Sequence, residues 1–180
     1  GVPEPEATHR PIPAKTILSE TIKSFLCKGP VERKTILMQI EAFEPNLQIL
    51  PEYKNNTKHI KNLSLHEVAL GDKPGTVAMD YGAHVGTYHV TKTNGPIEIK
   101  TLDSYNFQDV DVIKIDVEGF EVPLLDGAKE TIISNKPWIQ IEANKTGERY
   151  GRPKAKILEK LVSFGMKRVA KKWPDQIWRF

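Results

Sequence analysis

The amino-acid sequence predicts one α/β domain whose sheet is mostly parallel and closes with an antiparallel hairpin at one edge. Short apolar strands alternate with amphipathic helices along the chain, the arrangement that parallel strands with right-handed crossovers require. The strands are nearly continuous apolar runs, as expected where both faces of a sheet are covered. The last residues, 167–180, form two β-like runs around a turn at Pro174 and Asp175. A length of 180 residues and a hydrophobic content of 39% suit a single domain with its own core.

The N-terminal region differs in character from the rest of the chain. Residues 1–14 hold four prolines among charged neighbours and show no apolar period, which predicts a loose arm followed by a domain over residues 15–180. Four apolar residues then have helical spacing: Ile17, Ile22, Phe25 and Leu26. They predict a helix that ends near Gly29 and Pro30.

The remaining elements follow the strand and helix alternation. Buried strands are predicted at residues 35–43, 63–70, 111–116 and 138–142. Residues 76–79 and 97–102 are expected to pair across an irregular Gly-rich loop. Helices are expected up to about Asn56, from Gly119 to Asn135, and over residues 155–162 with Gly165 as a cap.

Composition excludes several classes of function. The net charge of +3, from 26 basic and 23 acidic residues, is too small to indicate a nucleic-acid partner by itself. The C-terminal region is nevertheless basic, with Lys154, Lys156, Lys160, Lys167, Arg168, Lys171, Lys172, Trp173 and Trp178. Nucleic-acid binding therefore stays a minor alternative, against the simpler interpretation of a solvated helix face and an edge strand protected by lysines.

The cysteine count and the hydropathy pattern indicate the cellular setting. Cys27 is the single cysteine, so neither an intramolecular disulfide nor a cysteine zinc cluster is possible. No apolar run approaches the roughly 20 residues that cross a bilayer, and the first residues do not resemble a signal peptide. We therefore expect a soluble, cytoplasmic protein without a membrane span.

Three stretches in the second to fourth strand regions carry a family resemblance. They are Ile40–Asn46 (IEAFEPN), Val68–Asp72 (VALGD) and Asp111–Glu121 (DVIKIDVEGFE), and the segments Leu102–Ser104, Leu124–Ala128 and Lys136–Glu142 keep the same order and spacing. Over residues 36–180 the chain resembles the FkbM-like family of S-adenosylmethionine-dependent methyltransferases. The resemblance implies a Rossmann-like class I methyltransferase sheet and S-adenosylmethionine as cofactor. It also implies methyl transfer to a hydroxyl of a small-molecule or carbohydrate-like acceptor.

Residues that directly follow the apolar strands are the candidate cofactor ligands, because open parallel sheets bind ligands beyond the carboxyl ends of their strands. Glu44, followed by Pro45, ends the strand before the first turn, and the resemblance implies that it binds the ribose hydroxyls. The alternative is a surface glutamate that caps the next helix. Ala69 and Leu70 are expected to cover the adenine face while Asp72 reaches a polar edge; core packing with a Gly-Asp turn is the alternative.

A second group of acidic residues lies where later strands end. Asp116 and Glu118 are expected to contact the methionine amino group of the cofactor or the acceptor hydroxyl, and Gly119 allows the tight turn between strand and helix. Glu121 is better explained as a residue that compensates the helix dipole. Glu142 ends the next strand and is the candidate general base. No third ligand at convincing spacing accompanies these carboxylates, so no metal is predicted.

One part of the family pattern is not found. The family opens with a strand that ends in an acidic residue and a Gly-rich loop close to the methionyl part of the cofactor, and residues 1–35 contain no such loop. The sequence therefore predicts a sheet that lacks its first strand and its glycine loop. A truncated chain and a degenerate fold without catalysis, serving as a binding or assembly module, are two explanations that stay open.

A third explanation is a rearranged fold. The stretch Asp80–Gly86 (DYGAHVG) is similar to the missing loop, so Gly82 and Gly86 are candidates to replace it. The residues that follow are too few and too β-branched for the helix that should come next. His84 and His89 lie in this region and are expected to be solvated loop residues.

Overall fold

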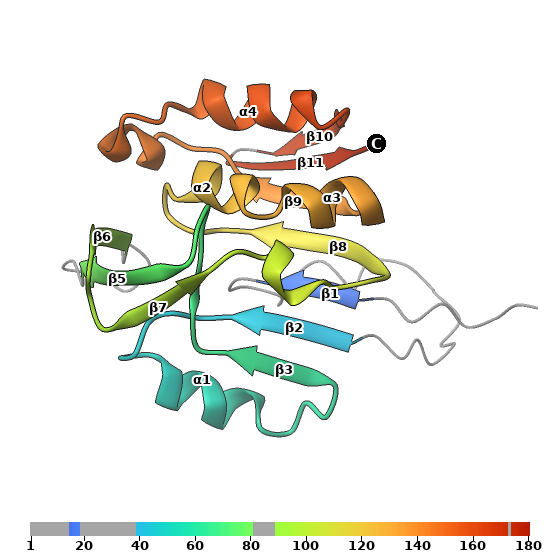
Figure 1. The fold of residues 1–180 in the computed structure, drawn as a ribbon. Coiled ribbons are helices and arrows are strands. Elements are labelled where there is room, and N and C mark those ends of the chain that lie inside the picture. Colours follow the sequence, from blue (N-terminus) through green and yellow to red (C-terminus); the bar gives the residue numbers. More distant parts are fainter. Residues whose placement is uncertain (1–14, 19–38, 81–88, 173) are drawn as a thin grey trace, which may run out of the picture.

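A computed structural model describes residues 15–18, 39–80, 89–172 and 174–180, which form two β-sheets and four α-helices (Figure 1). The strands of the larger sheet are β1 (Lys15–Leu18), β2 (Gln39–Phe43), β3 (Leu63–His66), β8 (Val110–Ile115), β9 (Trp138–Glu142), β10 (Lys167–Lys172) and β11 (Asp175–Arg179). The smaller sheet contains β4 (Ala69–Leu70), β5 (Gly75–Asp80), β6 (His89–Thr93) and β7 (Ile97–Lys100). The helices are α1 (Leu50–Thr57), α2 (Glu121–Asp126), α3 (Lys129–Asn135) and α4 (Lys154–Ser163).

The larger sheet has the order β10-β11-β9-β8-β1-β2-β3. Its strands β3, β2, β1, β8 and β9 pair in parallel, whereas β11 is antiparallel to both β9 and β10. The predicted mostly parallel sheet with a C-terminal antiparallel hairpin is therefore confirmed. The chain moves outward from β1 to β3 and then restarts at β8 on the other side of β1. This reversal of direction lies between β1 and β8, the place where open α/β sheets bind ligands.

The prediction that the sheet lacks its first strand is wrong, because β1 occupies the central position. Thr16 pairs with Ile40 of β2, and Ile17 pairs with both Glu41 of β2 and Ile113 of β8. The helix predicted to contain Ile17 is wrong at these residues for the same reason. Backbone hydrogen bonds on both sides and two β-branched residues favour a strand, and this tertiary pairing overrides a weak helical period. Residues 1–14, 19–38 and 81–88, and with them the predicted arm, the rest of that helix and the Gly82 and Gly86 loop, lie outside the described residues.

The smaller sheet divides a segment that the sequence presents as one strand. Residues 63–70 were predicted as a single strand, but β3 joins the larger sheet while β4 joins the smaller one. Val68, Ala69 and Leu70 are buried in succession, which breaks the alternation of a half-buried strand. The expected pairing of residues 76–79 with 97–102 is confirmed by β5 and β7, which pair in the antiparallel direction, and β6 is an additional strand on β5.

The helix predicted from Gly119 to Asn135 is two helices, α2 and α3. At the break, the Gly127 carbonyl accepts a hydrogen bond from Asp103 N at 2.9 Å instead of continuing the helix. A Cβ on Gly127 would lie 1.9 Å from Gly71 O, so the two glycines permit a close backbone approach. Asp103 also caps α3, accepting from Thr131 N at 2.8 Å and Glu130 N at 3.1 Å.

One hydrophobic core joins the helices to the larger sheet. Ile113 and Ile115 of β8 lie beside Ile139 and Ile141 of β9, and α2, α3 and α4 cover them. Residues of this interface that are no more than 2% exposed include Leu125 of α2, Ala128 between α2 and α3, Ile132 of α3, and Ile157 and Leu161 of α4. Each buried Leu or Ile contributes about 1.5–3 kcal/mol, so this interface anchors the strand ends that form the site.

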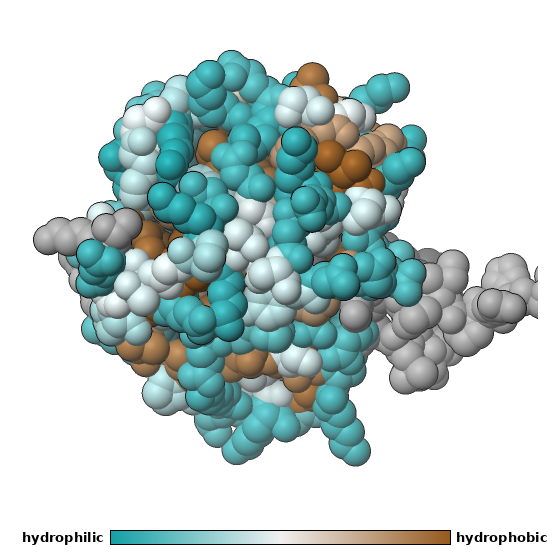
Figure 2. Space-filling view, in the orientation of Figure 1, coloured by the Kyte–Doolittle hydropathy of each residue, from teal (hydrophilic) through white to brown (hydrophobic). Residues whose placement is uncertain are grey.

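The face of the molecule shown in Figure 2 is mostly hydrophilic. Figure 2 shows hydrophobic side chains gathered near the ends of α3 and α4, where Ile133 is 42% and Val162 is 60% exposed. Within the described part of the chain, no helix has the length and hydropathy to cross a membrane.

Candidate functional site

Three of the predicted acidic residues lie at the carboxyl ends of neighbouring parallel strands. Glu44 follows β2, Asp116 follows β8 and Glu142 is the last residue of β9. The strands have the order β9-β8-β1-β2, so all three residues lie at one edge of the sheet, on both sides of the reversal between β1 and β8. This is the edge at which the sequence predicted a ligand site.

Asp116 and Glu142 form the centre of the site. Burial is the main cause that raises the pKa of Glu142 to about 7, and the neighbouring Asp116 raises it further by its charge and by a side-chain hydrogen bond. Lys114 Nζ lies 3.3 Å from Asp116 Oδ2 and forms an ion pair with it. Glu142 can therefore exchange a proton near neutral pH.

Asn144 fixes the orientation of Glu142. Its Nδ2 donates to Glu142 Oε1 at 2.7 Å, an interaction that opposes the rise in the Glu142 pKa. Asn144 Oδ1 in turn accepts hydrogen bonds from Thr146 N, at 2.7 Å, and from Thr146 Oγ1. The segment after β9 thus positions the carboxyl group as well as connecting β9 to α4.

Glu118 lies on a turn whose backbone is unusual. Its φ is +51° and that of Gly119 is +102°, both in the region that side chains disfavour. A Cβ on Gly119 would lie 2.7 Å from the carbonyl of Thr146, so only glycine fits between the two segments. Burial raises the pKa of Glu118, Asp116 raises it further, and Arg149 and His89 oppose the rise. We call Asp116, Glu118 and Glu142 the carboxylate cluster.

Glu121 lies next to this cluster but has a different role. It is the first residue of α2, is 2% exposed, and accepts a hydrogen bond from Gly119 N at 2.9 Å. Burial is the main cause that raises its pKa. The contact agrees with the expected structural role at the start of a helix.

Three aromatic rings adjoin the carboxylate cluster. Tyr150 makes T-shaped contacts with Phe120, at 5.8 Å between ring centroids, and with His89, at 6.3 Å. The Tyr150 hydroxyl donates to Val90 O, and burial raises the Tyr150 pKa to about 12, so the phenol stays protonated. His89 is partly buried in this contact, and the prediction of a solvated loop residue is wrong; His84 lies outside the described residues.

Asn144, Arg149 and Tyr150 were missed by sequence reasoning. They belong to the loop and short 3-10 helix, Thr146–Tyr150, between β9 and α4. The signal that could have found them is position, because this loop follows the carboxyl end of a parallel strand.

Glu44 is buried at the end of β2, with 7% of its surface exposed. Its Oε1 accepts a hydrogen bond from Asn46 N at 2.7 Å, and Asn46 Oδ1 accepts one from Gln48 N at 2.9 Å. The alternative of a surface glutamate is therefore wrong. Pro45, partly buried, is part of this tight turn, which holds the carboxylate in a defined place.

The VALGD segment is divided between two environments. Ala69 packs in the core of the smaller sheet with Val77 and Ile99, whereas Leu70 belongs to the main core. Asp72 is exposed. Leu70 lines the same cavity as Phe43, the last residue of β2.

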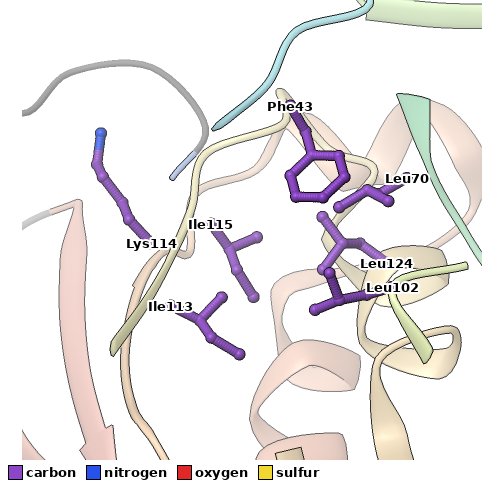
Figure 3. A pocket seen from close by; sticks show the side chains of 7 residues that line it. All are labelled: Phe43, Leu70, Leu102, Ile113, Lys114, Ile115 and Leu124. Atoms are coloured by element: carbon purple, nitrogen blue, oxygen red, sulfur yellow. The ribbon is translucent and has the colours of Figure 1, made fainter. Parts of the chain in front are cut away.

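A small apolar cavity lies below the strand ends (Figure 3). It is lined by Phe43, Leu70, Leu102, Ile113, Lys114, Ile115 and Leu124. Figure 3 shows that Lys114 points to the opposite side of β8 from the aliphatic side chains, so the cavity itself is apolar. Within the described ranges, no group of three His, Cys, Asp or Glu residues is arranged to hold a metal ion.

The fold and the site together define an α/β protein with a group of acidic residues at the carboxyl edge of a mainly parallel sheet. A sequence model of the methyltransferase FkbM domain matches residues 31–167. The chain belongs to the FkbM methyltransferase family.

Two known proteins show the extent of the similarity. The 2-O-methyltransferase NoeI of Sinorhizobium fredii is 26% identical over 152 residues, which cover 70% of this chain and 62% of NoeI. The crystal structure of a methyltransferase FkbM from Methylobacillus flagellatus superposes with a TM-score of 0.51 at 16% identity, covering 79% of this chain and 36% of that one. The chain therefore spans less than two thirds of the length of either relative, and the structural likeness concerns the fold alone.

Proposed function

We propose that this chain is an S-adenosylmethionine-dependent O-methyltransferase that acts on a hydroxyl of a small-molecule or carbohydrate-like acceptor. The larger sheet is then a Rossmann-like class I methyltransferase sheet, with β1 as its first strand. The hydrogen-bonded pair of Asp116 and Glu142 is the observation that carries this proposal. Family membership supports methyl transfer, and the name of NoeI, a 2-O-methyltransferase, supports an oxygen acceptor.

Glu142 is the general base in this proposal. A hydroxyl that receives a methyl group must lose its proton, and a base works best when its pKa lies near the working pH. With a pKa of about 7, a large fraction of Glu142 is ionised at neutral pH and still binds the departing proton firmly. Asp116, paired with Lys114, is the hydrogen-bond acceptor that orients the hydroxyl or the methionine amino group, and Glu118 supports it.

The residues present fit the cofactor in part. When bound, S-adenosylmethionine supplies an electrophilic methyl group on a sulfonium, so the protein must hold donor and acceptor in line. Glu44 and Pro45 would hold the ribose, because the buried Glu44 carboxylate is fixed by the Asn46 N–H. Leu70, next to Phe43 at the apolar cavity, suits the adenine side. Ala69, buried in the smaller sheet, and Asp72, exposed after it, would complete the adenine contacts.

Titration of the purified chain with S-adenosylhomocysteine tests the cofactor site. We expect binding that Glu44→Gln weakens about tenfold or more, because a charge-assisted hydrogen bond to a ribose hydroxyl is lost. Glu67→Gln, an exposed glutamate close to β3, is the matched control and should bind as the unchanged chain does. A cooperatively folded chain without binding would contradict the proposal and favour a fold that serves binding or assembly without catalysis.

Methyl transfer is tested separately with labelled S-adenosylmethionine and a panel of sugars and glycolipids. Label should appear on an oxygen of an acceptor, and Glu142→Gln should remove it while cofactor binding persists. Transfer that survives Glu142→Gln unchanged would exclude Glu142 as the base.

A further inference from the structure

Tyr150 lies where the loop after β9 meets the smaller sheet. Its hydroxyl donates a hydrogen bond to the carbonyl of Val90 on β6, a residue 60 positions away in the sequence. Its ring makes T-shaped contacts with Phe120, which precedes α2, and with His89, the first residue of β6. Tyr150 therefore contacts both the smaller sheet and the segment that follows β8.

The turn between β8 and α2 depends on neighbouring segments for its conformation. Glu118 and Gly119 both have positive φ, and a residue with a side chain keeps this conformation only where its surroundings hold it. The loop after β9 meets the turn at two points. Its backbone at Thr146 leaves no space for a Cβ on Gly119. The ring of Tyr150 packs against Phe120, the next residue of the turn, and so helps to hold the backbone that carries Glu118.

The loop that carries Tyr150 is folded tightly on itself. Arg152 N donates to Gly147 O at 3.0 Å, and a Cβ on Gly147 would lie 2.4 Å from Arg152 O. The Arg152 guanidinium lies 5.9 Å from the centroid of the Phe120 ring, a distance at which the face of an aromatic ring attracts a cation. The loop therefore gives Tyr150 a defined position against the turn.

The hydrogen bond to Val90 holds an edge of the smaller sheet. In the order β4-β7-β5-β6, β6 pairs with β5 alone among the described strands. Val90 packs against the core of the smaller sheet, as Phe120 does. Burial raises the Tyr150 pKa to about 12, so the phenol stays protonated and remains a donor to this carbonyl. Tyr150 thus links β6 to the turn that precedes α2.

Tyr150 also lies on the side of the carboxylate cluster that is far from the proposed ribose contact. The strand order is β9-β8-β1-β2, with Glu44 after β2 and the Tyr150 loop after β9. Neighbouring strands lie about 4.8 Å apart, so the ends of β9 and β2 are separated by roughly 14 Å. A substitution of Tyr150 should therefore affect the acceptor side of the site and leave the nucleoside side unchanged.

We propose that Tyr150 is a positioning residue for the acceptor: it joins β6 to the turn that carries Glu118, so that β6 forms one wall of the acceptor site. This role rests on the proposed function, because it concerns the same site. Tyr150 acts through the residues that it contacts. It exchanges no proton during methyl transfer, because its hydroxyl is engaged with the carbonyl of Val90.

Steady-state kinetics of Tyr150→Phe test this role, with the sugar or glycolipid of the panel that receives most label as the acceptor. The substitution removes only the hydroxyl, so the acceptor KM should rise about fivefold, the loss typical of one hydrogen bond. Both kcat and the affinity for S-adenosylhomocysteine should change by less than about twofold. Tyr105→Phe is the matched control, because Tyr105 is also half-buried and its hydroxyl makes no hydrogen bond among the described residues. It should leave the acceptor KM unchanged.

A second variant, Tyr150→Leu, removes the ring contacts as well and should raise the acceptor KM about threefold or more beyond the value for Tyr150→Phe. Equal acceptor KM values in Tyr150→Phe and Tyr105→Phe would overturn the role and leave the proposed function standing. Equal weakening of acceptor and S-adenosylhomocysteine binding would also overturn it, because a general loss of packing affects both. A fall in kcat at constant KM would instead assign Tyr150 to the chemical step. If the unchanged chain transfers no methyl group to any acceptor, the proposed function fails and this role fails with it.

Discussion

The carboxylate cluster and the two cations that β10 brings to one face of the sheet, Arg168 and Lys171, hold like charges by different means. Burial raises the pKa of Glu142 to about 7, so this carboxyl is partly protonated beside Asp116 at neutral pH, and the backbone around the two residues is held by Asn144 and Gly119. All six residues of β10 are exposed, so solvent and salt screen the charges of its cations. Changes at the carboxylate cluster should therefore affect stability and pH dependence strongly, whereas changes at the cations of β10 should affect stability only weakly.

The largest effect is expected from Gly119→Ala. The added Cβ would meet the Thr146 carbonyl at 2.7 Å, and φ is +102°, so the turn that carries Glu118 must move. We expect about 2–4 kcal/mol of destabilisation in urea unfolding, with loss of the Glu142 pKa shift. Gly151→Ala is the control, since its φ is +67° but nothing lies within 4 Å of the new atom. It should lose only about 1 kcal/mol, from backbone strain alone. If Gly119→Ala and Gly151→Ala lose the same free energy of unfolding, the close contact of Gly119 with Thr146 does not stabilise the carboxylate cluster.

A second prediction concerns the pH dependence of transfer. Because the base must be ionised, the rate should rise with pH through about 7, the pKa of Glu142. Glu142→Gln should reduce the rate about 10²–10⁴-fold and remove the rise of the rate with pH. Glu148→Gln, at an exposed glutamate in the same loop region, should leave the rate and its pH dependence unchanged. If the rate of Glu142→Gln still rises through pH 7, another group must be responsible for the rise.

The same shift predicts how stability depends on pH. The folded-state pKa of Glu142 is raised from 4.5 to about 7, so between these values the folded chain binds more protons than the unfolded chain. Stability from this group is therefore present below pH 4.5 and falls as the pH rises through about 7. The raised pKa values of Glu118 and Glu121 act in the same direction. Between pH 4.5 and about 7, the free energy of unfolding measured in urea should decline less for Glu142→Gln than for the unchanged chain. An equal decline in the two proteins would contradict the assigned pKa of Glu142.

A smaller effect is expected from Asn144→Ala. Asn144 donates to Glu142 and opposes the rise in its pKa, so removing the amide should raise that pKa further. The carboxyl resonance of Glu142 should titrate at higher pH, and the rise of the transfer rate with pH should move to higher pH by the same amount. Thr146→Val, which keeps the backbone N–H bond to Asn144 and removes only the hydroxyl bond, should give a smaller shift in the same direction. A lower rate with an unchanged pH profile would mean that Asn144 contributes only packing and does not affect the pKa of Glu142.

The difference between these two regions also explains which parts could be predicted from the sequence. Strands β8 and β9 are apolar runs that end in acids, so the sequence alone places Asp116 and Glu142 at strand ends. Strand β1 could not be found in this way, because four residues acquire their structure from partners at Gln39–Ala42 and Val110–Lys114.

Other features depend on contacts that no local pattern records. The break between α2 and α3 depends on Asp103 and on the approach of Gly71 to Gly127. The bulge that brings Arg168 and Lys171 to one face is a one-residue shift in a run, Lys167–Lys172, whose sequence is otherwise typical of a protected edge strand. The site roles of Glu44, Asp116, Glu118 and Glu142 remain predictions that the experiments above address.

The smallest effect is expected from the cations of β10. Lys171→Gln relieves repulsion with Lys154 and Arg168, but β10 is exposed, so the free energy of unfolding should change by less than about 0.5 kcal/mol. The substitution should be stabilising at low salt, and the effect should vanish at high salt, because screening removes the repulsion that the substitution relieves. Lys172→Gln, which pairs with Asp175 on the other face, should show no such salt dependence. A large loss of stability in Lys171→Gln would contradict the prediction and show that Lys171 supports the fold of β10.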